Sequence, residues 1–402
     1  MSLVVSTARR SAVIALVAGL FLAIFVATGG PQPQTRVAAQ RLDTYTPVTG
    51  AIFNRPVGTS AEQRAIFTHV NRTIDATPPG ATIRFAVFSF SEQATADKLL
   101  AAYRRGVNVQ LIFDDHVVYP QEARLRSVIG RNPNQRSFVV LCHKSCRGTS
   151  GNMHDKVFLF SQAGQASNVV MVGSNNMTRH NAIDQWSDIY TVVGDPVLFW
   201  TYSGVFEQMK FDRPMTAPYI DADVNGYEPQ FYPYPGVSQA TDPLYQILSK
   251  VTCTGTTTET QTDEYGNPTE VEVPVTTSLR ISQHAWNGAR GKYLARKVAE
   301  LKGAGCDIEV IYGVGMGASV KAILASAGIP MSKGRVKGVR THQKTLLLSG
   351  VYDGDPNARI VWTGSHNWSD GALRRDEIIF KVQGQAAYDQ YIANWNDIWA
   401  NG

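Results

Sequence analysis

The chain contains the same series of short motifs twice, and this repeat restricts the possible fold more than any other feature. Each copy has a histidine and a lysine two residues apart, followed by a Gly-Ser-x-Asn sequence. The copies are His154/Lys156 with residues 173–176, and His342/Lys344 with residues 364–367. Either motif alone is common in surface strands and turns. Two copies in the same order, at nearly equal spacing, indicate a duplicated unit.

The segments that precede each copy also correspond. Residues 82–88 begin with the polar and apolar alternation of a strand, a helix is predicted over about 91–104, and a second strand follows at 107–113. In the second half, residues 279–283, 291–302 and 307–312 repeat this order. Strands joined by a helical crossover run parallel. We therefore expect an α/β fold of two pseudo-twofold-related lobes, with mostly parallel sheets flanked by helices.

Composition indicates where these lobes begin and end. A chain of 402 residues is longer than one average domain. We place the first lobe at 40–210 and the second at 238–402. The Pro/Tyr-rich segment at 211–237 cannot form a regular helix and is expected to be a linker, which could border a substrate cleft. A threonine-rich stretch at about 254–277 predicts an exposed β-hairpin insertion in the second lobe.

Residues 1–39 have the pattern of a secretory signal peptide. Two arginines precede an uncharged apolar run at 12–27, and small residues at 37–39 suit a signal peptidase. We therefore expect a secreted protein that begins at Gln40. The alternative is an uncleaved signal that anchors the protein in a membrane, although this run is slightly shorter than the roughly 20 residues needed to span a bilayer.

Cleavage of this signal would change the charge of the protein. The full chain has a formal net charge of +5, and loss of the three arginines in residues 1–39 lowers it to +2. Proteins that bind nucleic acid usually carry a clustered basic surface. A nearly neutral body therefore gives no strong indication of nucleic-acid binding, which we treat as the less favoured possibility.

The chain has 4 cysteines, an even number, which in an exported protein predicts disulfide bonds. We expect one bond in each half, Cys142–Cys146 and Cys253–Cys306. A zinc site is the alternative. However, Cys142 and Cys146 have no second Cys/His pair nearby to complete a tetrahedral set, apart from His143 between them. We expect no bound metal and no cofactor.

The repeated motifs suit chemistry on a phosphodiester. A histidine and a lysine two apart on a strand point to the same face, so each copy presents an imidazole beside an ammonium. Lysines and asparagine amides can hold the phosphate charge. One histidine can attack phosphorus while the other protonates the leaving alkoxide, and this chemistry needs no metal. Both copies must then face one another in a single site.

An acidic residue follows each copy at a similar distance. Asp188 lies 34 residues after His154, and Glu377 lies 35 residues after His342. A carboxylate that accepts from an imidazole Nδ1–H fixes the tautomer and raises the basicity of the ring. We therefore expect Asp188 and Glu377 to lie behind the two histidines.

These motifs resemble those of the phospholipase D superfamily, His-x-Lys-x4-Asp with a following Gly-Ser-x-Asn. The resemblance extends from about Gly50 to Trp399 and implies a two-lobed α/β sandwich with its site at the pseudo-twofold interface. It implies that His154 is the nucleophile and His342 the general acid. It further implies a set of phosphate-binding residues, namely Lys156, Lys344, Asn176 and Asn367, with support from Ser174 and Ser365.

One position departs from this motif, since its aspartate is Ser161 in the first half and Ser349 in the second. The resemblance implies that this aspartate is structural, because members such as tyrosyl-DNA phosphodiesterase lack it and remain active. The chemistry is therefore expected to survive, while assignment to the orthodox phospholipases is weakened.

Together these features predict a secreted, monomeric phosphodiesterase that makes transient contact with a membrane surface and cleaves phospholipid head groups, with hydrolysis or transfer left open. A secreted nuclease of the same superfamily is the first alternative. A catalytically inactive binding module is the second.

Overall fold

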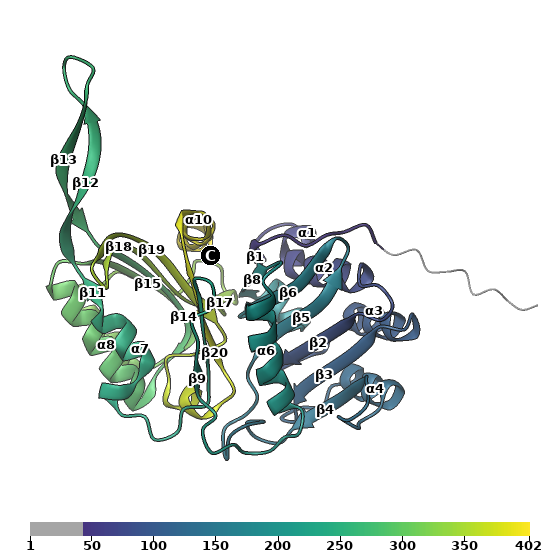
Figure 1. Cartoon of the computed structure of the whole chain (residues 1–402). Helices are drawn as coiled ribbons and strands as arrows, with labels where there is room; N and C mark the ends of the chain where they lie inside the picture. The colour runs from purple at the N-terminus through teal and green to yellow at the C-terminus, as the bar shows by residue number, and fades with distance from the viewer. Residues whose placement is uncertain (1–42) are drawn as a thin grey trace, which may run out of the picture. The chain divides into compact units, whose positions relative to one another are not determined.

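Two large β-sheets with helices on their outer faces make up residues 43–402, the part of the chain that the computed structural model describes (Figure 1). The expected signal in residues 1–39 lies outside the described residues. The first lobe contains β1 (Gly50–Phe53), α1 (Ser60–Gln63), α2 (Ala65–Asp75), β2 (Thr82–Val87), α3 (Gln93–Arg104), β3 (Asn108–Asp114), α4 (Pro120–Ile129), β4 (Phe138–Cys142), β5 (Lys156–Ala163), β6 (Ala166–Gly173), α5 (Arg179–Ile183), β7 (Gln185–Trp186), β8 (Asp188–Val192) and α6 (Pro196–Met209).

The second lobe repeats this order with additions. It contains β9 (Ile220–Asp221), β10 (Tyr227–Phe231), η1 (Gln239–Thr241), α7 (Pro243–Ser249), β11 (Val251–Thr252), β12 (Thr254–Thr262), β13 (Pro268–Thr276), β14 (Ser278–Trp286), α8 (Gly288–Gly303), β15 (Asp307–Met316), α9 (Ala318–Ser326), β16 (Met331–Ser332), β17 (Arg340–Thr341), β18 (Lys344–Tyr352), β19 (Asp355–Gly364), η2 (Asp370–Arg374), β20 (Ile378–Gln383) and α10 (Gln385–Asn401).

The expected α/β fold with flanking helices is confirmed, but the expectation of mostly parallel sheets is wrong. The strand orders are β1-β8-β6-β5-β2-β3-β4 and β16-β15-β14-β18-β19-β20-β10-β9. Within these sheets only β2–β3–β4 and β14–β15–β16 pair in parallel. The helical crossovers explain these parallel pairs. The His-x-Lys strands β5 and β18 instead enter hairpins with β6 and β19 through two-residue turns, which allow only antiparallel pairing.

Three apolar clusters hold these layers together. One lies between the first sheet and α2, α3 and α4, and one lies between the second sheet and α7, α8 and α9. The third joins the two sheets through α6 and α10 and includes Tyr202, Phe206, Tyr391 and Trp395. Because this cluster contains buried residues from both sheets, the lobes share one core.

The segment expected to be a linker contributes to the second sheet. Within residues 211–237, β10 pairs with β20 and β9 pairs with β10. Tyr219 and Tyr234 stack with ring centroids 4.1 Å apart. The proline and tyrosine content therefore reflects an edge of the second sheet and the turns around it.

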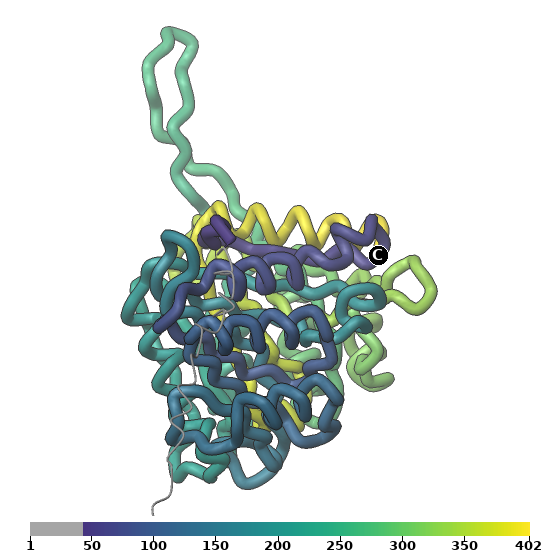
Figure 2. The backbone as a smooth tube through the Cα atoms, turned by 90° about the vertical axis from the view of Figure 1, so that its right-hand side faces the viewer, coloured from purple at the N-terminus to yellow at the C-terminus, as the bar shows by residue number. Residues whose placement is uncertain are grey.

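Strands β12 and β13 form a long hairpin that projects away from the rest of the chain in both views (Figures 1 and 2). Almost all of its side chains are exposed or half-buried. It occupies the threonine-rich stretch for which the sequence predicted a hairpin insertion.

Both expected disulfide bonds are present. Cys142–Cys146 closes the loop that leads toward His154. Cys253–Cys306 joins the residue before β12 to the residue before β15, over a sequence separation of 53. None of the helices in residues 43–402 has the length and apolarity needed to cross a bilayer.

Candidate active site

Two short backbone pairings between the lobes position the histidines. Met153 pairs in parallel with Asp376, and the His154 N–H donates to the Asp376 carbonyl over 2.9 Å. In the pseudo-symmetric position, Thr341 of β17 pairs with Trp186 of β7, and the His342 N–H donates to the Trp186 carbonyl over 2.8 Å. The backbone of each histidine is therefore hydrogen-bonded to a residue of the opposite lobe that lies just before a strand of the sheet.

The two His-x-Lys motifs form one buried electrostatic cluster. His154 and His342 are each 6% exposed, and both lysines are more deeply buried. Burial lowers the pKa of both imidazoles well below the usual value, and the lysine of the same motif and then that of the opposite lobe lower each further. Burial also lowers the pKa of Lys156 to about 7 and that of Lys344 well below its usual value.

The acid behind His154 comes from the other lobe. His154 Nδ1 lies 2.9 Å from Glu377 Oε2, and Glu377 is fully buried. Burial raises the pKa of Glu377 to about 7, although Lys156 and Arg375 favour its charged form. A proton on Nδ1 satisfies this contact and leaves the Nε2 lone pair available for attack.

His342 has a different partner. Its Nδ1 lies 2.9 Å from the Ser174 carbonyl oxygen and 3.2 Å from Asn181 Nδ2. A carbonyl only accepts, so the shorter contact places a proton on Nδ1 and exposes Nε2 to the site. The ring is thus oriented by an uncharged group, and the two halves of the site are chemically unequal.

The expectation that Asp188 lies behind a histidine is wrong. Its side chain accepts from Ser174 Oγ, Thr363 Oγ1 and Tyr391 Oη, and it joins the lobes beneath the site. Burial raises the pKa of Asp188 above its usual value, and the hydrogen bonds from these hydroxyls offset only part of that increase.

A one-residue offset explains this difference. The Ser174 N–H donates to the Asp188 carbonyl, whereas the Ser365 N–H donates to the Ile378 carbonyl. Ser187, rather than Asp188, is therefore the counterpart of Glu377. Shifting a strand residue by one turns its side chain to the other face.

The asparagines of the Gly-Ser-x-Asn motifs have buried atoms with no partner among residues 43–402. These include Oδ1 of Asn176 and Oδ1 of Asn367, whose residues are 7% and 4% exposed. Buried amides are usually hydrogen-bonded, and a group left open at a functional site indicates a ligand. Ser365 Oγ accepts from the Ile378 N–H over 2.9 Å, and so supports the strand that carries Glu377.

Each lysine donates to the backbone carbonyl of the histidine in its own motif. Lys156 does so over 2.6 Å, and Lys344 makes the corresponding contact with His342. Each ammonium has three N–H groups. Two donors on each lysine therefore remain for a phosphate, which matches the role that the resemblance implies.

Several neighbours of the histidines were not predicted from the sequence. The His284 ring lies 4.5 Å from that of His342, and Phe88 lies 4.7 Å from His154 at the equivalent position. Burial and nearby Lys344 lower the pKa of His284 to about 3. Arg375 adds positive charge near Glu377. Since these residues carry no motif, only the fold brings them to the site.

His366, inside the second Gly-Ser-x-Asn motif, serves a supporting network. Its Nε2 contacts Arg290 Nη1, and the Arg290 guanidinium forms a buried ion pair with Asp242. Its ring also lies 4.2 Å from that of Tyr232. These contacts fix the loop that carries Asn367.

A polar cavity of about 370 Å³ opens at His342. Hydroxyl, amide and basic side chains line it, namely Ser89, Ser91, Tyr119, Asn176, Thr178, Arg179, His180, Asn181, Gln185 and His342. No carboxylate from the described residues lines it.

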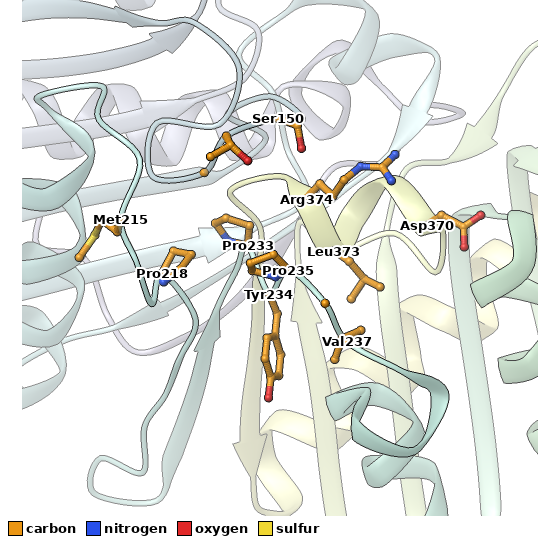
Figure 3. A pocket seen from close by; sticks show the side chains of 13 residues that line it. Ser150, Met215, Pro218, Pro233, Tyr234, Pro235, Val237, Asp370, Leu373 and Arg374 are labelled. Atoms are coloured by element: carbon orange, nitrogen blue, oxygen red, sulfur yellow. The ribbon is translucent and has the colours of Figure 1, made fainter.

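A second, more apolar cavity of about 540 Å³ lies beside the loops that lead into His154 and Glu377 (Figure 3). Ser150 and Arg374 from these loops form part of its wall. Much of the rest is apolar and comes from the proline- and tyrosine-rich segment, including Met215, Pro218, Pro233, Tyr234, Pro235, Val237 and Leu373.

Metal ligands do not converge in the described part of the chain, where no three His, Cys, Asp or Glu side chains lie in a metal-binding group. Positive charge at the site comes instead from Lys156, Lys344 and Arg375, each of which acts on the titration of Glu377.

Comparison with known proteins identifies the first lobe. Residues 72–210 match the family described as "Cardiolipin synthase, PLD-like domain". The chain contains a phospholipase D-like domain. This match confirms the resemblance to the phospholipase D superfamily, a group of enzymes that act on phosphodiesters. No curated protein sequence matches the chain.

Solved structures show the same fold over both lobes. The phosphatidylserine synthase of Haemophilus influenzae Rd KW20 is similar with a TM-score of 0.54 and 13% identity, over 87% of this chain and 86% of that one. The polyphosphate kinase of Porphyromonas gingivalis has a TM-score of 0.52 and 10% identity over 87% of this chain. This chain covers only 50% of the kinase.

Proposed function

We propose that the protein is a phosphodiesterase that forms a covalent phospho-histidine at His154. The His154 Nε2 lone pair attacks phosphorus, and the bond from phosphorus to the leaving oxygen breaks. His342 Nε2–H gives its proton to that oxygen. Water then attacks phosphorus and passes a proton to His342, and the phosphorus–nitrogen bond breaks to restore His154.

The contact from His154 to Glu377 supports this division of roles. A carboxylate stabilises the cation that develops on the attacking imidazole, so His154 is the better nucleophile. His342 has a carbonyl in this position, which leaves its protonated form more acidic and better suited to donate. An incoming phosphate anion favours protonation of His342 before the reaction.

The lysines and asparagines supply the electrostatic part of catalysis. Lys156, Lys344, Asn176 and Asn367 would hold the non-bridging oxygens as charge develops. Because these donors are already fixed and buried, little reorganisation is needed, and the mechanism proceeds without a metal.

We propose a phospholipid as the substrate, because the two cavities differ in polarity. The apolar cavity beside the loops of His154 and Glu377 suits the acylglycerol part, which stays on the phosphohistidine. The polar cavity at His342 suits the head group that leaves. Phosphodiesters in nucleic acid have similarly polar groups on both sides, so they would not use this difference.

We also propose that the protein is exported by its first 39 residues and acts as a monomer outside the cell. Its mature N-terminus can be sequenced after secretion. Gln40 at that end would support cleavage, and retention of the first residues would favour the anchored alternative.

The mechanism is tested with mature protein on phospholipid vesicles and on plasmid DNA, each with EDTA. Head-group release that persists in EDTA and is lost in both His154→Ala and His342→Ala would support the proposal. DNA cleavage without lipid cleavage would favour the nuclease, and loss of all activity in EDTA would contradict the metal-free mechanism. Acid-labile labelling of His342→Ala, but not His154→Ala, by a substrate with a good leaving group would assign the nucleophile.

A further inference from the structure

We propose that Arg147 is a positioning residue for the nucleophile His154, and that the Cys142–Cys146 disulfide holds Arg147 in the place where it acts. This inference rests on the proposed function, in which His154 attacks phosphorus with Glu377 behind it. Arg147 lies between β4 and the first His-x-Lys motif, outside every repeated motif of the sequence. It acts through the residues around Glu377 rather than on the substrate.

The Arg147 guanidinium joins three segments that are far apart in the chain. Arg147 and Asp376 are both fully buried, and Arg147 Nε donates to Asp376 Oδ1 over 3.3 Å. Its Nη1 donates to the Pro218 carbonyl over 2.9 Å, and its Nη2 donates to the Tyr232 carbonyl. One side chain therefore connects the first lobe with the proline- and tyrosine-rich segment and with the second lobe.

Two of these partners position the backbone of Glu377. Asp376 directly precedes Glu377, and the Asp376 carbonyl accepts from the His154 N–H over 2.9 Å. The Tyr232 N–H donates to the Glu377 carbonyl, also over 2.9 Å. Arg147 thus fixes the neighbours of Glu377 on both sides. The contact of the Glu377 carboxylate with His154 Nδ1 depends on where these neighbours lie.

The Cys142–Cys146 disulfide fixes the loop that carries Arg147. Cys142 is the last residue of β4, and Cys146 directly precedes Arg147. The Cys146 N–H donates to Asp376 Oδ2 over 2.6 Å, while Arg147 donates to Oδ1. Both carboxylate oxygens of Asp376 are therefore bound by the disulfide-bonded loop. A displacement of this loop would move Asp376, and Glu377 with it.

Positioning explains this buried ion pair better than stability does. The loss of hydration on burial offsets much of the attraction between two charges, so such pairs contribute little net stability. The pseudo-symmetric place does without one. There, Asn54 Oδ1 accepts from the N–H of Ser187, the counterpart of Glu377, over 2.7 Å. The charged pair occurs on the side where a carboxylate must meet the imidazole of the nucleophile.

The test compares folded variants in the hydrolysis of bis(4-nitrophenyl) phosphate, with a thermal melt of each. Arg147→Lys keeps the charge, but one ammonium does not reproduce the planar fork that reaches all three segments. We expect kcat to fall by about 10-fold or more and KM to change by less than about 2-fold, because the phosphate-binding groups stay in place while the nucleophile is misplaced. Arg147→Met is avoided, since it would leave Asp376 buried without a counter-charge.

The two disulfide bonds supply a matched pair of variants. Cys142→Ser/Cys146→Ser should lower kcat by a factor similar to that of Arg147→Lys. Cys253→Ser/Cys306→Ser should keep kcat within about 2-fold of the wild-type value, although it opens the longer loop and destabilises the fold more. A purely structural role predicts the reverse, with the greater loss of activity in the less stable variant. That order would overturn the inference.

A second measurement does not depend on turnover. The His154 Nδ1–H that faces Glu377 should give a downfield proton resonance, assigned by its absence from His154→Ala. We expect this resonance to be lost in Arg147→Lys and kept in Cys253→Ser/Cys306→Ser. Its retention in Arg147→Lys, or an unchanged kcat, would overturn the inference and leave the proposed function intact. If the wild-type protein hydrolyses no phosphodiester, the proposed function fails, and the resonance alone decides whether Arg147 positions His154.

Discussion

His154 and Glu377 lie 223 residues apart in the chain, yet the imidazole Nδ1 and the carboxylate Oε2 are 2.9 Å apart across the lobe interface. The parallel pairing of Met153 with Asp376 produces this contact, because it sets His154 beside the residue that follows Asp376. Neither lobe holds a complete nucleophile by itself.

Removing the charge of Glu377 should slow the attack. We expect Glu377→Gln to lower kcat by about 10²-fold or more, because the cation on His154 loses its partner. Steady-state kinetics on a soluble phosphodiester measure this. Asp188→Asn is the comparison, since it removes a buried carboxylate that contacts no histidine. Its kcat should change by less than about 10-fold, while stability falls by about 1–3 kcal/mol. The reverse ranking would contradict the assigned roles.

An acid can be introduced behind the second histidine. Ser187→Asp places a carboxylate at the position equivalent to Glu377, and a negative charge there should raise the pKa of His342 by about one unit. Since His342 acts in its protonated form, the alkaline limb of the kcat profile should move to higher pH. A thermal melt confirms that the variant is folded. An unchanged limb in a folded variant would show that His342 does not limit the rate in that range.

Anion binding should depend on the protonation of Lys156. Burial lowers the pKa of Lys156 to about 7, so this ammonium loses its charge as pH rises through 7. Inhibition by inorganic phosphate should therefore weaken above pH 7, and Lys156→Met should weaken it mainly below pH 7, where the wild-type lysine is charged. The inhibition constant, measured from pH 5 to 9, reports this directly. A constant affinity up to pH 9 would mean that the lysine keeps its usual pKa.

The two disulfide bonds should contribute unequally to stability. Cys253–Cys306 closes a loop with a sequence separation of 53, whereas Cys142–Cys146 has a separation of 4. Loop entropy predicts losses of about 4 and about 2 kcal/mol when each pair is changed to serine. Denaturant unfolding of the two double variants tests this order.

Much of the site could be predicted from the sequence because the His-x-Lys and Gly-Ser-x-Asn motifs are local and occur twice. The acids could not be assigned by the same means. Counted from the preceding Gly-Ser serine, Asp188 lies 14 residues on and Glu377 lies 12, and this difference was a sign that the two are not equivalent. Deciding which strand residue faces a histidine required the register across the lobes, which depends on tertiary packing.

The sheets show the same limit. The crossover pattern predicts the parallel strands correctly, but β6, β8, β19 and β20 pair antiparallel through hairpins and longer loops, which periodicity does not encode. Likewise, Asn181 and His284 have no sequence signature, since their roles depend on the segments packed against His342.

The two short pairings between the lobes also make activity a late event in the life of the polypeptide. A first lobe that emerges from the ribosome and folds alone already has His154, but the carboxylate behind it is still untranslated. Such a chain has no catalytic activity until Glu377 has been synthesised and the second lobe has docked against the first. Two separately expressed halves, each inactive, should regain activity when mixed, in the manner of a split reporter enzyme.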